Sequence, residues 1–335
     1  MSELPPLSLP LHLHAENYAG VSEVFEVSDR RVREALARHP ALAAKVRVTV
    51  GHGGDILERE LATADAVLCW NFPRHDLARR APRLRWVHVH GAGVGHLMPL
   101  DWLPRGAVLT NSRGVHGQRA TEYAFMAVLM LNNRVPEMFT NQRTSRWRQL
   151  FNTGVEGKTL LIVGVGHIGA GAAAWAKRAG MRVLGIRRSG RARRHVDEMH
   201  RPDALHALLP RADFVLVSAP HTTQTHHMLG AAELDLLRPG AGLVNYSRAQ
   251  LVDYDALLER LEARRLSAVL DVFDPEPLPA SSALWRAPNV VITPHCSSDD
   301  AERYTPRTLD LVLDNAARLI EGKPLRNRVG RRREY

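Results

Sequence analysis

Three side chains of the kinds that a carbonyl-reducing site needs stand far apart in the sequence: Arg248, Glu276 and His295. A guanidinium holds an anionic substrate and polarises its carbonyl group, and an imidazole donates a proton to the carbonyl oxygen. A carboxylate beside the imidazole keeps it in the protonated form. The combination predicts reduction of a 2-keto acid, with Arg248 as the substrate anchor, His295 as the proton donor and Glu276 as its partner.

Each of these residues also has an ordinary interpretation. Arg248 could be one of many surface arginines, Glu276 a turn residue between two prolines, and His295 a histidine satisfied after a Thr-Pro turn. If the three residues form no shared site, all three ordinary interpretations must hold at once. Because the residues follow successive apolar runs, and all come after a glycine-rich loop, a shared site is the favoured interpretation.

The glycine-rich segment 164–169, with the sequence GVGHIG, connects an apolar run to an alanine-rich helical pattern. Gly164 permits a tight turn, Gly166 lets the backbone approach a pyrophosphate, and Gly169 allows the helix to lie close to the strand. The pyrophosphate would meet N–H groups at the helix start, around His167 and Ile168. The segment predicts a dinucleotide-binding site, and the alternative is a glycine-rich turn without a ligand.

The next apolar run ends in Arg187-Arg188-Ser189, where an NAD-binding site has an acidic residue. That acidic residue accepts hydrogen bonds from the ribose hydroxyls, whereas two guanidiniums and a hydroxyl can hold a 2′-phosphate. The ending therefore favours NADP(H) as the cofactor. NAD(H) is the alternative, since Arg187 could instead stack on the adenine ring.

The elements that must position these residues are also visible in the sequence. Short apolar runs alternate with amphipathic stretches, which is typical of βα units and parallel sheets. The runs fall in two sets. The first comprises 46–50, 66–69 and 86–89 and ends near 108–109. The second comprises 160–163, 183–186, 214–217, 242–245, 268–272 and 290–292. Helical patterns cover 119–131, between the two sets, and 309–321, after the last run. The predicted fold class is α/β, with two Rossmann-like domains that each have a parallel sheet.

The order of the elements predicts where the domains begin and end. Residues 1–108 and 297–335 are expected to form a discontinuous, flavodoxin-like substrate-binding domain. Residues 109–296 are expected to form a dinucleotide-binding Rossmann domain inserted into it. Because no low-complexity linker separates the halves, the chain is expected to cross between the domains at short hinges.

Composition excludes several other classes of protein. The chain has 335 residues, 45% of them hydrophobic and 24% charged, which is typical of a globular protein long enough for two domains. Two cysteines are too few for a disulfide framework or a cysteine-based zinc site, and no metal is predicted. The net charge of +10 comes from residues spread along the chain, which favours a solvated basic surface over a nucleic-acid-binding face.

The sequence also carries an expectation about location. The start of the chain has no basic segment followed by an apolar one. The longest uncharged stretch that could suggest a membrane span, 159–176, contains four glycines and a histidine and is barely long enough to span a bilayer. We therefore expect a cytoplasmic protein without a membrane partner.

Further motifs accompany these residues. His90-Gly91-Ala92-Gly93-Val94 stands in the first third, Thr110-Asn111-Ser112-Arg113-Gly114 precedes the helical pattern at 119–131, and Ala219-Pro220-His221-Thr222 with Thr225 follows the run 214–217. With the glycine loop and the three residues named first, these motifs cover most of the chain. On them the chain resembles the D-isomer-specific 2-hydroxyacid dehydrogenases, and more closely their glyoxylate/hydroxypyruvate reductase branch.

The resemblance implies a function and roles for individual residues. It implies reduction of glyoxylate, hydroxypyruvate or a related 2-keto acid to the D-2-hydroxy acid, with the catalytic roles given above, by a homodimer built on the cofactor domains. It also implies that Asp271 and the backbone of Tyr246 orient the nicotinamide carboxamide, and that backbone amides near Ala92 and Gly93 bind the substrate carboxylate. The remaining cofactor contacts that it implies come from Ala219, Pro220 and Thr225.

Some positions depart from the family pattern. Ala249 stands where a glycine usually follows the catalytic arginine, and His221 replaces a commoner aliphatic residue close to the cofactor. The loop 297–300, with the sequence SSDD, is more polar and acidic than usual. Trp70 and Trp147 are candidate walls of the substrate pocket, with ordinary aromatic packing as the alternative. The departures bear on substrate size and rate more than on the type of reaction.

Two other functions are compatible with the same fold. One is a dinucleotide-sensing binding protein like the C-terminal-binding-protein corepressors, which resemble this family and retain similar residues. The other is oxidation of formate or phosphite. The full set of Arg248, Glu276 and His295 argues against the dinucleotide-sensing protein. The absence of an acidic residue after the apolar run 183–186 argues against oxidation of formate or phosphite.

Overall fold

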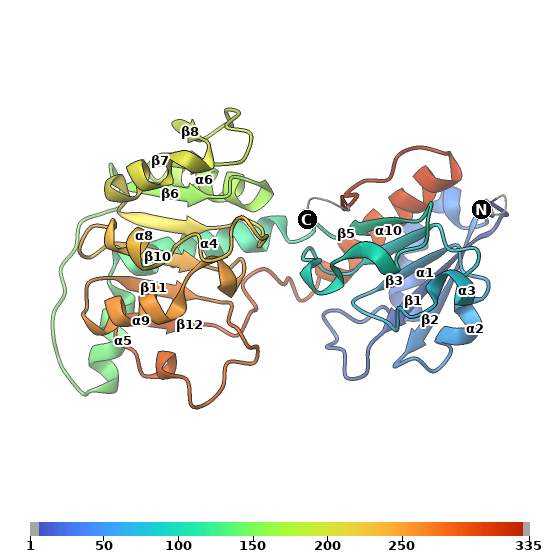
Figure 1. Ribbon diagram of the computed structural model, residues 1–335, viewed down its shortest axis with the longest axis horizontal. Coiled ribbons are helices and arrows are strands. Elements are labelled where there is room, and N and C mark those ends of the chain that lie inside the picture. The colour runs from blue at the N-terminus through green and yellow to red at the C-terminus, as the bar shows by residue number, and fades with distance from the viewer. Residues whose placement is uncertain (1–6, 331–335) are drawn as a thin grey trace. The chain divides into compact units, whose positions relative to one another are not determined.

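The computed structural model describes residues 7–330 and divides into two compact units (Figure 1). Within the described residues, the first unit holds the chain up to Val115 and from Asp300 onward, and the second unit holds His116–Asp299. The sequence analysis placed both changes of unit a few residues earlier, after residues 108 and 296. The outer ends of the predicted segments 1–108 and 297–335 lie outside the described residues.

The first unit is built on a parallel sheet with the strand order β2-β1-β3-β4-β5. Its strands are β1 Leu11–Asn17, β2 Val46–His52, β3 Ala66–Cys69, β4 Trp86–Val89 and β5 Val108–Asn111. Successive side chains of a strand point to opposite faces, so Leu11 and Leu13 of β1 enter a hydrophobic core while His12 and His14 lie on the other face. Those two histidines are buried but hydrogen-bonded, both to the hydroxyl of Thr49.

Helices cover the sheet of the first unit. They are α1 Asp29–Arg38, α2 Leu57–Leu61, α3 Leu77–Arg80 and α10 Tyr304–Ile320, with short 3-10 turns at Pro40–Leu42, Gly95–Leu97 and Leu100–Trp102. Helix α10 starts five residues before the predicted 309–321, and Pro306 lies in its first turn. A proline is tolerated there because the N–H groups of the first turn have no partner within the helix.

The second unit has a larger parallel sheet with the strand order β12-β11-β10-β9-β6-β7-β8. Its strands are β6 Thr159–Val163, β7 Arg182–Ile186, β8 Glu198–His200, β9 Phe214–Val217, β10 Gly242–Asn245, β11 Ser267–Leu270 and β12 Val290–Ile292. The sequence analysis predicted every strand of this sheet except β8. That strand is short, polar and only half-buried, so it has no apolar run to reveal it.

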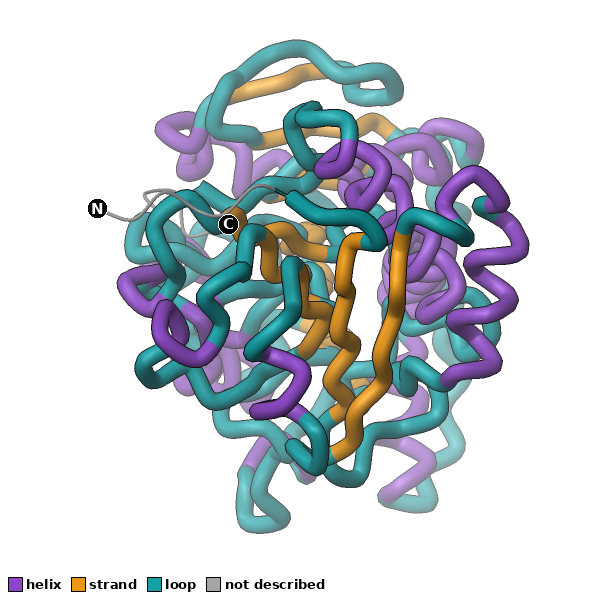
Figure 2. The backbone as a smooth tube through the Cα atoms, turned by 90° about the vertical axis from the view of Figure 1, so that its right-hand side faces the viewer, coloured by secondary structure: helices purple, strands orange, loops and turns teal. Residues whose placement is uncertain are grey.

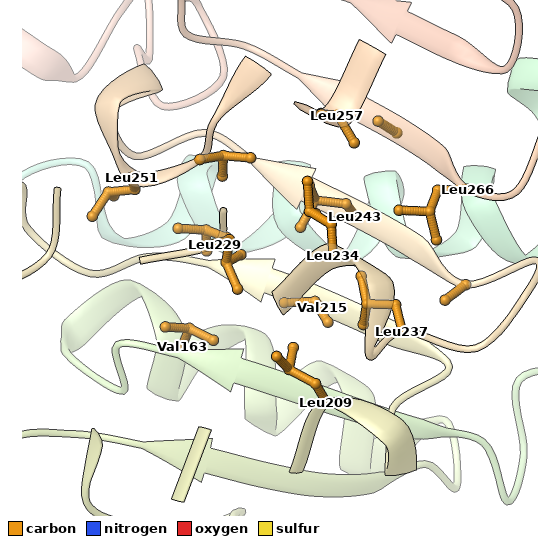
Figure 3. Close-up of a cluster of buried hydrophobic side chains, with 14 of the residues drawn as sticks. Val163, Leu209, Val215, Leu229, Leu234, Leu237, Leu243, Leu251, Leu257 and Leu266 are labelled. Atoms are coloured by element: carbon orange, nitrogen blue, oxygen red, sulfur yellow. The ribbon is translucent and has the colours of Figure 1, made fainter. Parts of the chain in front are cut away.

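Helices also pack against the sheet of the second unit. They are α4 Gly117–Asn132, α5 Val135–Arg143, α6 His167–Arg178, α7 Leu205–Leu208, α8 Ala231–Asp235 and α9 Tyr254–Glu262, with 3-10 turns at Pro202–Ala204, Leu209–Arg211, Ala249–Leu251 and Ala283–Trp285. One core lies between the strands and α8 and α9, and it includes Val215, Leu243 and Leu257 (Figure 3). Another core joins α4 and α6 to the sheet.

The predicted α/β fold class is confirmed, because both sheets are parallel and their strands alternate with helices along the chain. Figure 2 shows helices and loops lying beside the strands. Among residues 7–330, none of the helices combines the length and apolar character that crossing a membrane requires.

Candidate active site

The glycine-rich loop joins β6 to α6 with a geometry that only glycine permits. Gly164 has a φ of +101°, and a Cβ there would lie 2.3 Å from the backbone nitrogen of Ala219. A Cβ on Gly169 would lie 2.7 Å from the carbonyl oxygen of Gly164. Gly166, which precedes the helix, has no atom within 4 Å of its Cβ position. Gly164 and Gly169 therefore permit close packing, and Gly166 leaves open space in front of the helix start.

That open space suits the pyrophosphate of a dinucleotide. Helix α6 begins at His167 and is 12 residues long, so its first N–H groups, including that of Ile168, have no partner within the helix. Such a helix start favours an anion. The hydroxyl of Ser218 donates to the carbonyl oxygen of Gly164 at 2.8 Å and holds the loop from the neighbouring strand β9. The residues present fit the predicted cofactor.

Arginines gather where β7 and β8 end. The register pairs Ile186 with His200, and the N–H of Arg187 donates to the carbonyl oxygen of His200, so the two strand ends lie side by side. Arg187 is half-buried, while Arg188 and Ser189 are exposed. Arg201 follows β8 at the same edge, and its Cγ lies 2.9 Å from the position of a Cβ on Gly190.

Arg201 was not predicted from the sequence, because strand β8 was not predicted either. Its stem lies over the turn that carries Arg188 and Ser189, and Gly190 leaves the space for it. Two adjacent strand ends therefore carry three arginines, and guanidinium groups are the donors that suit a phosphate monoester best.

The loop after β9 lies against the glycine loop. The hydroxyl of Ser247 donates to the carbonyl oxygen of Ala219, and the hydroxyl of Thr225 donates to that of Pro220 at 2.9 Å. Thr225 therefore fixes the shape of this loop through its own side chain. His221 lies in the same loop, with its Nε2 3.2 Å from Nδ1 of His226.

The carboxyl ends of β10, β11 and β12 lie next to one another. Strand β11 is the central one of the three: its Leu270 pairs with Asn245 of β10 on one side and with Ile292 of β12 on the other. Arg248 follows the first of these strands, Glu276 the second and His295 the third. Parallel pairing thus brings the loops that carry all three residues to one edge of the sheet.

The imidazole of His295 and the carboxylate of Glu276 form a pair. Nδ1 of His295 lies 2.7 Å from Oε2 of Glu276, and Oε1 of the same carboxylate accepts the N–H of Phe273 at 2.7 Å. Both carboxylate oxygens are thereby fixed. Since Nδ1 is committed to Glu276, Nε2 is the ring nitrogen that can give a proton to a substrate.

The backbone around His295 is held by a buried carboxylate. Asp271 is fully buried, and its Oδ1 accepts the hydroxyl of Thr293 at 2.6 Å and the N–H of Cys296 at 3.1 Å, while its Oδ2 accepts the N–H of Ser297 at 3.1 Å. His295 has a φ of +48°, a left-handed conformation that a residue with a side chain adopts at a cost of about 1–2 kcal/mol. Bonds on both sides of His295 therefore maintain a strained backbone.

Arg248 is placed by a buried amide. Asn245, which is fully buried at the end of β10, donates from Nδ2 to the carbonyl oxygen of Arg248 at 3.1 Å. Burial lowers the pKa of Arg248, and the charge of the Glu276 carboxylate opposes this shift, so the two side chains lie within electrostatic reach of each other. The structure thus brings together the guanidinium, the carboxylate and the imidazole predicted from the sequence.

Tyr246, between Asn245 and Arg248, faces the core. Its ring packs edge-on against Tyr123 with the ring centroids 6.1 Å apart, and burial raises the pKa of its phenol. Its backbone is therefore the part that can meet a ligand. The predicted contact of this backbone and of Asp271 with the nicotinamide carboxamide stays a prediction.

The remaining predicted site residues belong to the first unit. Ala92 and Gly93 follow β4 and are half-buried, and Asn111 Nδ2 donates to the carbonyl oxygen of Ala92 at 2.7 Å. Trp70 packs edge-on against Phe25, with ring centroids 5.6 Å apart, and leaves no room for a side chain on Gly91. The predicted roles of Ala92, Gly93 and Trp70 in substrate binding stay predictions.

Two residues that the sequence analysis did not select as site residues lie near the three catalytic candidates. Nδ1 of His116 lies 3.5 Å from Oδ1 of Asp299. Arg248 and His295 both act electrostatically on His116, which places all of them in one neighbourhood. The acidic loop at Asp299 was a visible signal, whereas nothing in the sequence marks His116 among 17 histidines. Within residues 7–330 no group of three or more His, Cys, Asp or Glu side chains is arranged to hold a metal ion.

Comparison with known proteins bears directly on this geometry. Residues 125–297 match the family model described as the NAD binding domain of D-isomer specific 2-hydroxyacid dehydrogenases. The chain belongs to the D-isomer specific 2-hydroxyacid dehydrogenase family. The predicted resemblance is confirmed, and so is the prediction of an oxidoreductase with a nicotinamide dinucleotide-binding domain.

Named members of this family are similar over most of the chain. A glyoxylate reductase from Korarchaeum cryptofilum is 33% identical over 265 residues, which is 74% of this chain and 76% of that protein. Glyoxylate/hydroxypyruvate reductase B from Erwinia tasmaniensis is 32% identical over 342 residues, with 97% of each chain covered.

Solved structures of family members have the same fold. A D-isomer specific 2-hydroxyacid dehydrogenase from Xanthobacter autotrophicus, in complex with NADPH and MES, has a TM-score of 0.84 at 30% identity, covering 98% of this chain and 100% of that one. An NADPH-dependent glyoxylate/hydroxypyruvate reductase from Sinorhizobium meliloti, in complex with NADP and sulfate, has a TM-score of 0.80 at 28% identity, covering 97% and 100%.

Proposed function

We propose that this chain catalyses the NADPH-dependent reduction of a small 2-keto acid of the glyoxylate or hydroxypyruvate type to the D-2-hydroxy acid. The observation that carries the proposal is the 2.7 Å contact between Nδ1 of His295 and Glu276, with the half-buried Arg248 within electrostatic reach of that carboxylate. The names of the similar proteins, glyoxylate reductase and glyoxylate/hydroxypyruvate reductase, support the same reaction.

Each of the three residues has a distinct part in the proposed mechanism. The guanidinium of Arg248 holds the carboxylate of the keto acid and polarises its C2 carbonyl group. Nε2 of His295 donates a proton to the carbonyl oxygen as C2 is reduced, and Glu276 keeps the ring oriented through its contact with Nδ1. The bound nicotinamide supplies the hydride.

Asp271 holds the proton donor in place. Because its carboxylate accepts N–H groups on the C-terminal side of His295 and a hydroxyl on the N-terminal side, the imidazole is presented from a fixed loop. Preorganisation of this kind reduces the loss of entropy when substrate and proton donor must align.

The cofactor that this site favours is NADP(H). Arg187, Arg188 and Ser189 would hold the 2′-phosphate, as the sequence predicted, and we add Arg201 from the adjacent strand end. The pyrophosphate would lie at the start of α6, next to Gly166. Similar structures crystallised with NADPH or NADP support this preference.

We further propose a homodimer formed through the second unit. Trp147 is 94% exposed and Phe151 is 83% exposed, in the irregular segment that follows α5, and Phe139 on α5 is also exposed. Large apolar side chains with so much exposed area are typical of interfaces. A second copy of the chain would cover them. A cytoplasmic location stays a prediction from the sequence.

A substrate panel tests the reaction. NADPH oxidation is followed at 340 nm with glyoxylate, hydroxypyruvate and pyruvate, each repeated with NADH, for the wild-type chain and for His295→Asn. We expect turnover with at least one keto acid, a preference for NADPH, and a loss of at least about a hundredfold in kcat for the variant. Tight NADPH binding without turnover of any keto acid would instead favour the dinucleotide-sensing protein.

A further inference from the structure

A second imidazole–carboxyl pair, which the proposed mechanism does not use, lies close to the catalytic residues. Nδ1 of His116 donates to the carbonyl oxygen of Ser298 at 3.4 Å and lies 3.5 Å from Oδ1 of Asp299. The side chains of His116 and Asp299 are only 11% and 23% exposed. They are also the first and last residues of the second unit, so this pair joins the two ends of that unit.

The pair lies within electrostatic reach of the reacting groups. Burial lowers the pKa of His116 to about 4, and the positive charges of Arg248 and His295 contribute to this shift against the hydrogen bond to Ser298. The charge of His295 also acts on Asp299. Each residue of the pair is therefore coupled to at least one group that would bind or protonate the substrate.

Hydrogen bonds hold the loop that leads from His295 to Asp299. The N–H groups of Cys296 and Ser297 donate to the buried carboxylate of Asp271, and Ser298 accepts from His116. Because these bonds hold the loop between the two residues, the distance between the side chains of His295 and Asp299 cannot vary freely. A carboxyl group held in this way can select among substrates.

The pair carries a negative charge near neutral pH. His116 is uncharged there, because its pKa is well below 7. Burial raises the pKa of Asp299 to about 6, with the nearby charge of Asp271 adding to the shift and that of His295 opposing it, so most molecules carry an ionised Asp299 above pH 7. Nothing in His116 neutralises that charge. The site thus presents a carboxylate in addition to the one that is paired with His295.

We propose that Asp299, positioned by His116, determines substrate specificity by accepting a hydrogen bond from a hydroxyl group on C3 of the keto acid and by excluding a second carboxylate at that position. A carboxylate accepts a hydrogen bond from a hydroxyl but repels another carboxylate held close to it. This inference rests on the proposed function, since it concerns the substrate of the same site. It assigns the chain to monocarboxylic 2-keto acids with a hydrogen or a hydroxymethyl group on the carbonyl carbon.

A comparison of two substrates of similar size tests the assignment. Hydroxypyruvate and 2-oxomalonate differ in having a hydroxymethyl group or a second carboxylate on the carbonyl carbon. We measure kcat/KM for both with NADPH at pH 7.5, for the wild type, Asp299→Asn, Asp299→Ser and the control Glu302→Gln. The control removes one exposed negative charge three residues away. NADPH binding by each variant reports whether the second unit remains folded.

We expect wild type and control to prefer hydroxypyruvate by the same ratio, and both Asp299 variants to lower that ratio by about tenfold or more. Inhibition of the wild type gives a second measurement that needs no variant: D-glycerate should bind more tightly than hydroxymalonate. A ratio that changes less than threefold in the Asp299 variants, or equal inhibition by the two acids, would overturn the inference while glyoxylate turnover still supported the proposed function. A wild type that reduces no keto acid would refute both.

Discussion

Replacing Asp271 by asparagine is expected to displace the loop that carries His295. The carboxylate accepts three hydrogen bonds, from the hydroxyl of Thr293 and from the N–H groups of Cys296 and Ser297. An asparagine keeps one acceptor oxygen, and its NH2 group cannot accept, so at least one buried donor loses its partner. The left-handed backbone of His295 would then relax, because fewer bonds maintain it.

The size of the effect follows from these bonds. An unpaired buried donor costs about 1–3 kcal/mol, and a hydrogen bond to a charged group is worth about 1.5–3 kcal/mol. A loss of about 2–4 kcal/mol in holding the loop corresponds to a roughly 30- to 1,000-fold fall in kcat, at 1.36 kcal/mol for each factor of ten. Thr293→Val removes one of the three bonds to Asp271 and should lower kcat by a smaller factor.

Two assays separate the loop-holding role of Asp271 from a contact with the cofactor. Steady-state kinetics with glyoxylate and saturating NADPH give kcat, and quenching of protein fluorescence gives the dissociation constant for NADPH. We expect Asp271→Asn to lower kcat strongly and to raise the NADPH dissociation constant by less than about threefold. An unchanged kcat together with a large loss of NADPH affinity would refute the reasoning, because Asp271 would then act through the nicotinamide carboxamide.

Three further predictions concern other parts of the molecule. Glu276→Gln should lower kcat with glyoxylate by about a hundredfold, because His295 loses its charged partner, and an unchanged kcat would contradict the proposed mechanism. Arg201→Ala should raise KM for NADPH by about tenfold and leave KM for NADH unchanged. The control Arg193→Ala, at an exposed arginine, should change neither KM value much. Equal effects of Arg201→Ala on both KM values would show that Arg201 does not bind the 2′-phosphate. Burial lowers the pKa of His88 from 6.5 to about 3, so its neutral form stabilises the fold fully above pH 6.5, and stability should fall by up to about 1.4 kcal/mol per unit as the pH drops toward 3. The free energy of unfolding, measured with urea between pH 7 and 5, should therefore depend less steeply on pH for His88→Gln than for the wild type. The same pH dependence in both proteins would show that His88 does not titrate in this way.

Some features could be predicted because their signal is local. The glycine loop is six adjacent residues with a strand before it and a helix after it, and each glycine has a steric reason that holds for any chain of this fold. The arginines after β7 were readable for the same reason, since the end of that strand follows directly from an apolar run. Local rules of this kind do not depend on the rest of the chain.

Two strands were missed because their sequences do not look like buried strands. Strand β1 alternates leucine with histidine, and its polar face is buried only because partners such as Thr49 and Thr63, distant in sequence, satisfy those histidines. Strand β8 is three residues long and has no apolar run at all. Missing β8 also concealed Arg201, whose place beside Gly190 follows from the pairing of β7 with β8.

The sequence by itself determined the α/β fold class, the cofactor-binding loop and the types of residue that could reduce a keto acid, because apolar periodicity and strand-end residues are properties of short segments. Tertiary structure alone decided the 2.7 Å contact between His295 and Glu276, the three bonds to Asp271, and the nearness of His116 and Asp299 to Arg248 and His295. Those contacts join loops that parallel pairing of β10, β11 and β12 brings to one edge of a sheet. Distances between residues that far apart in the chain depend on strand order and register, which no single segment contains.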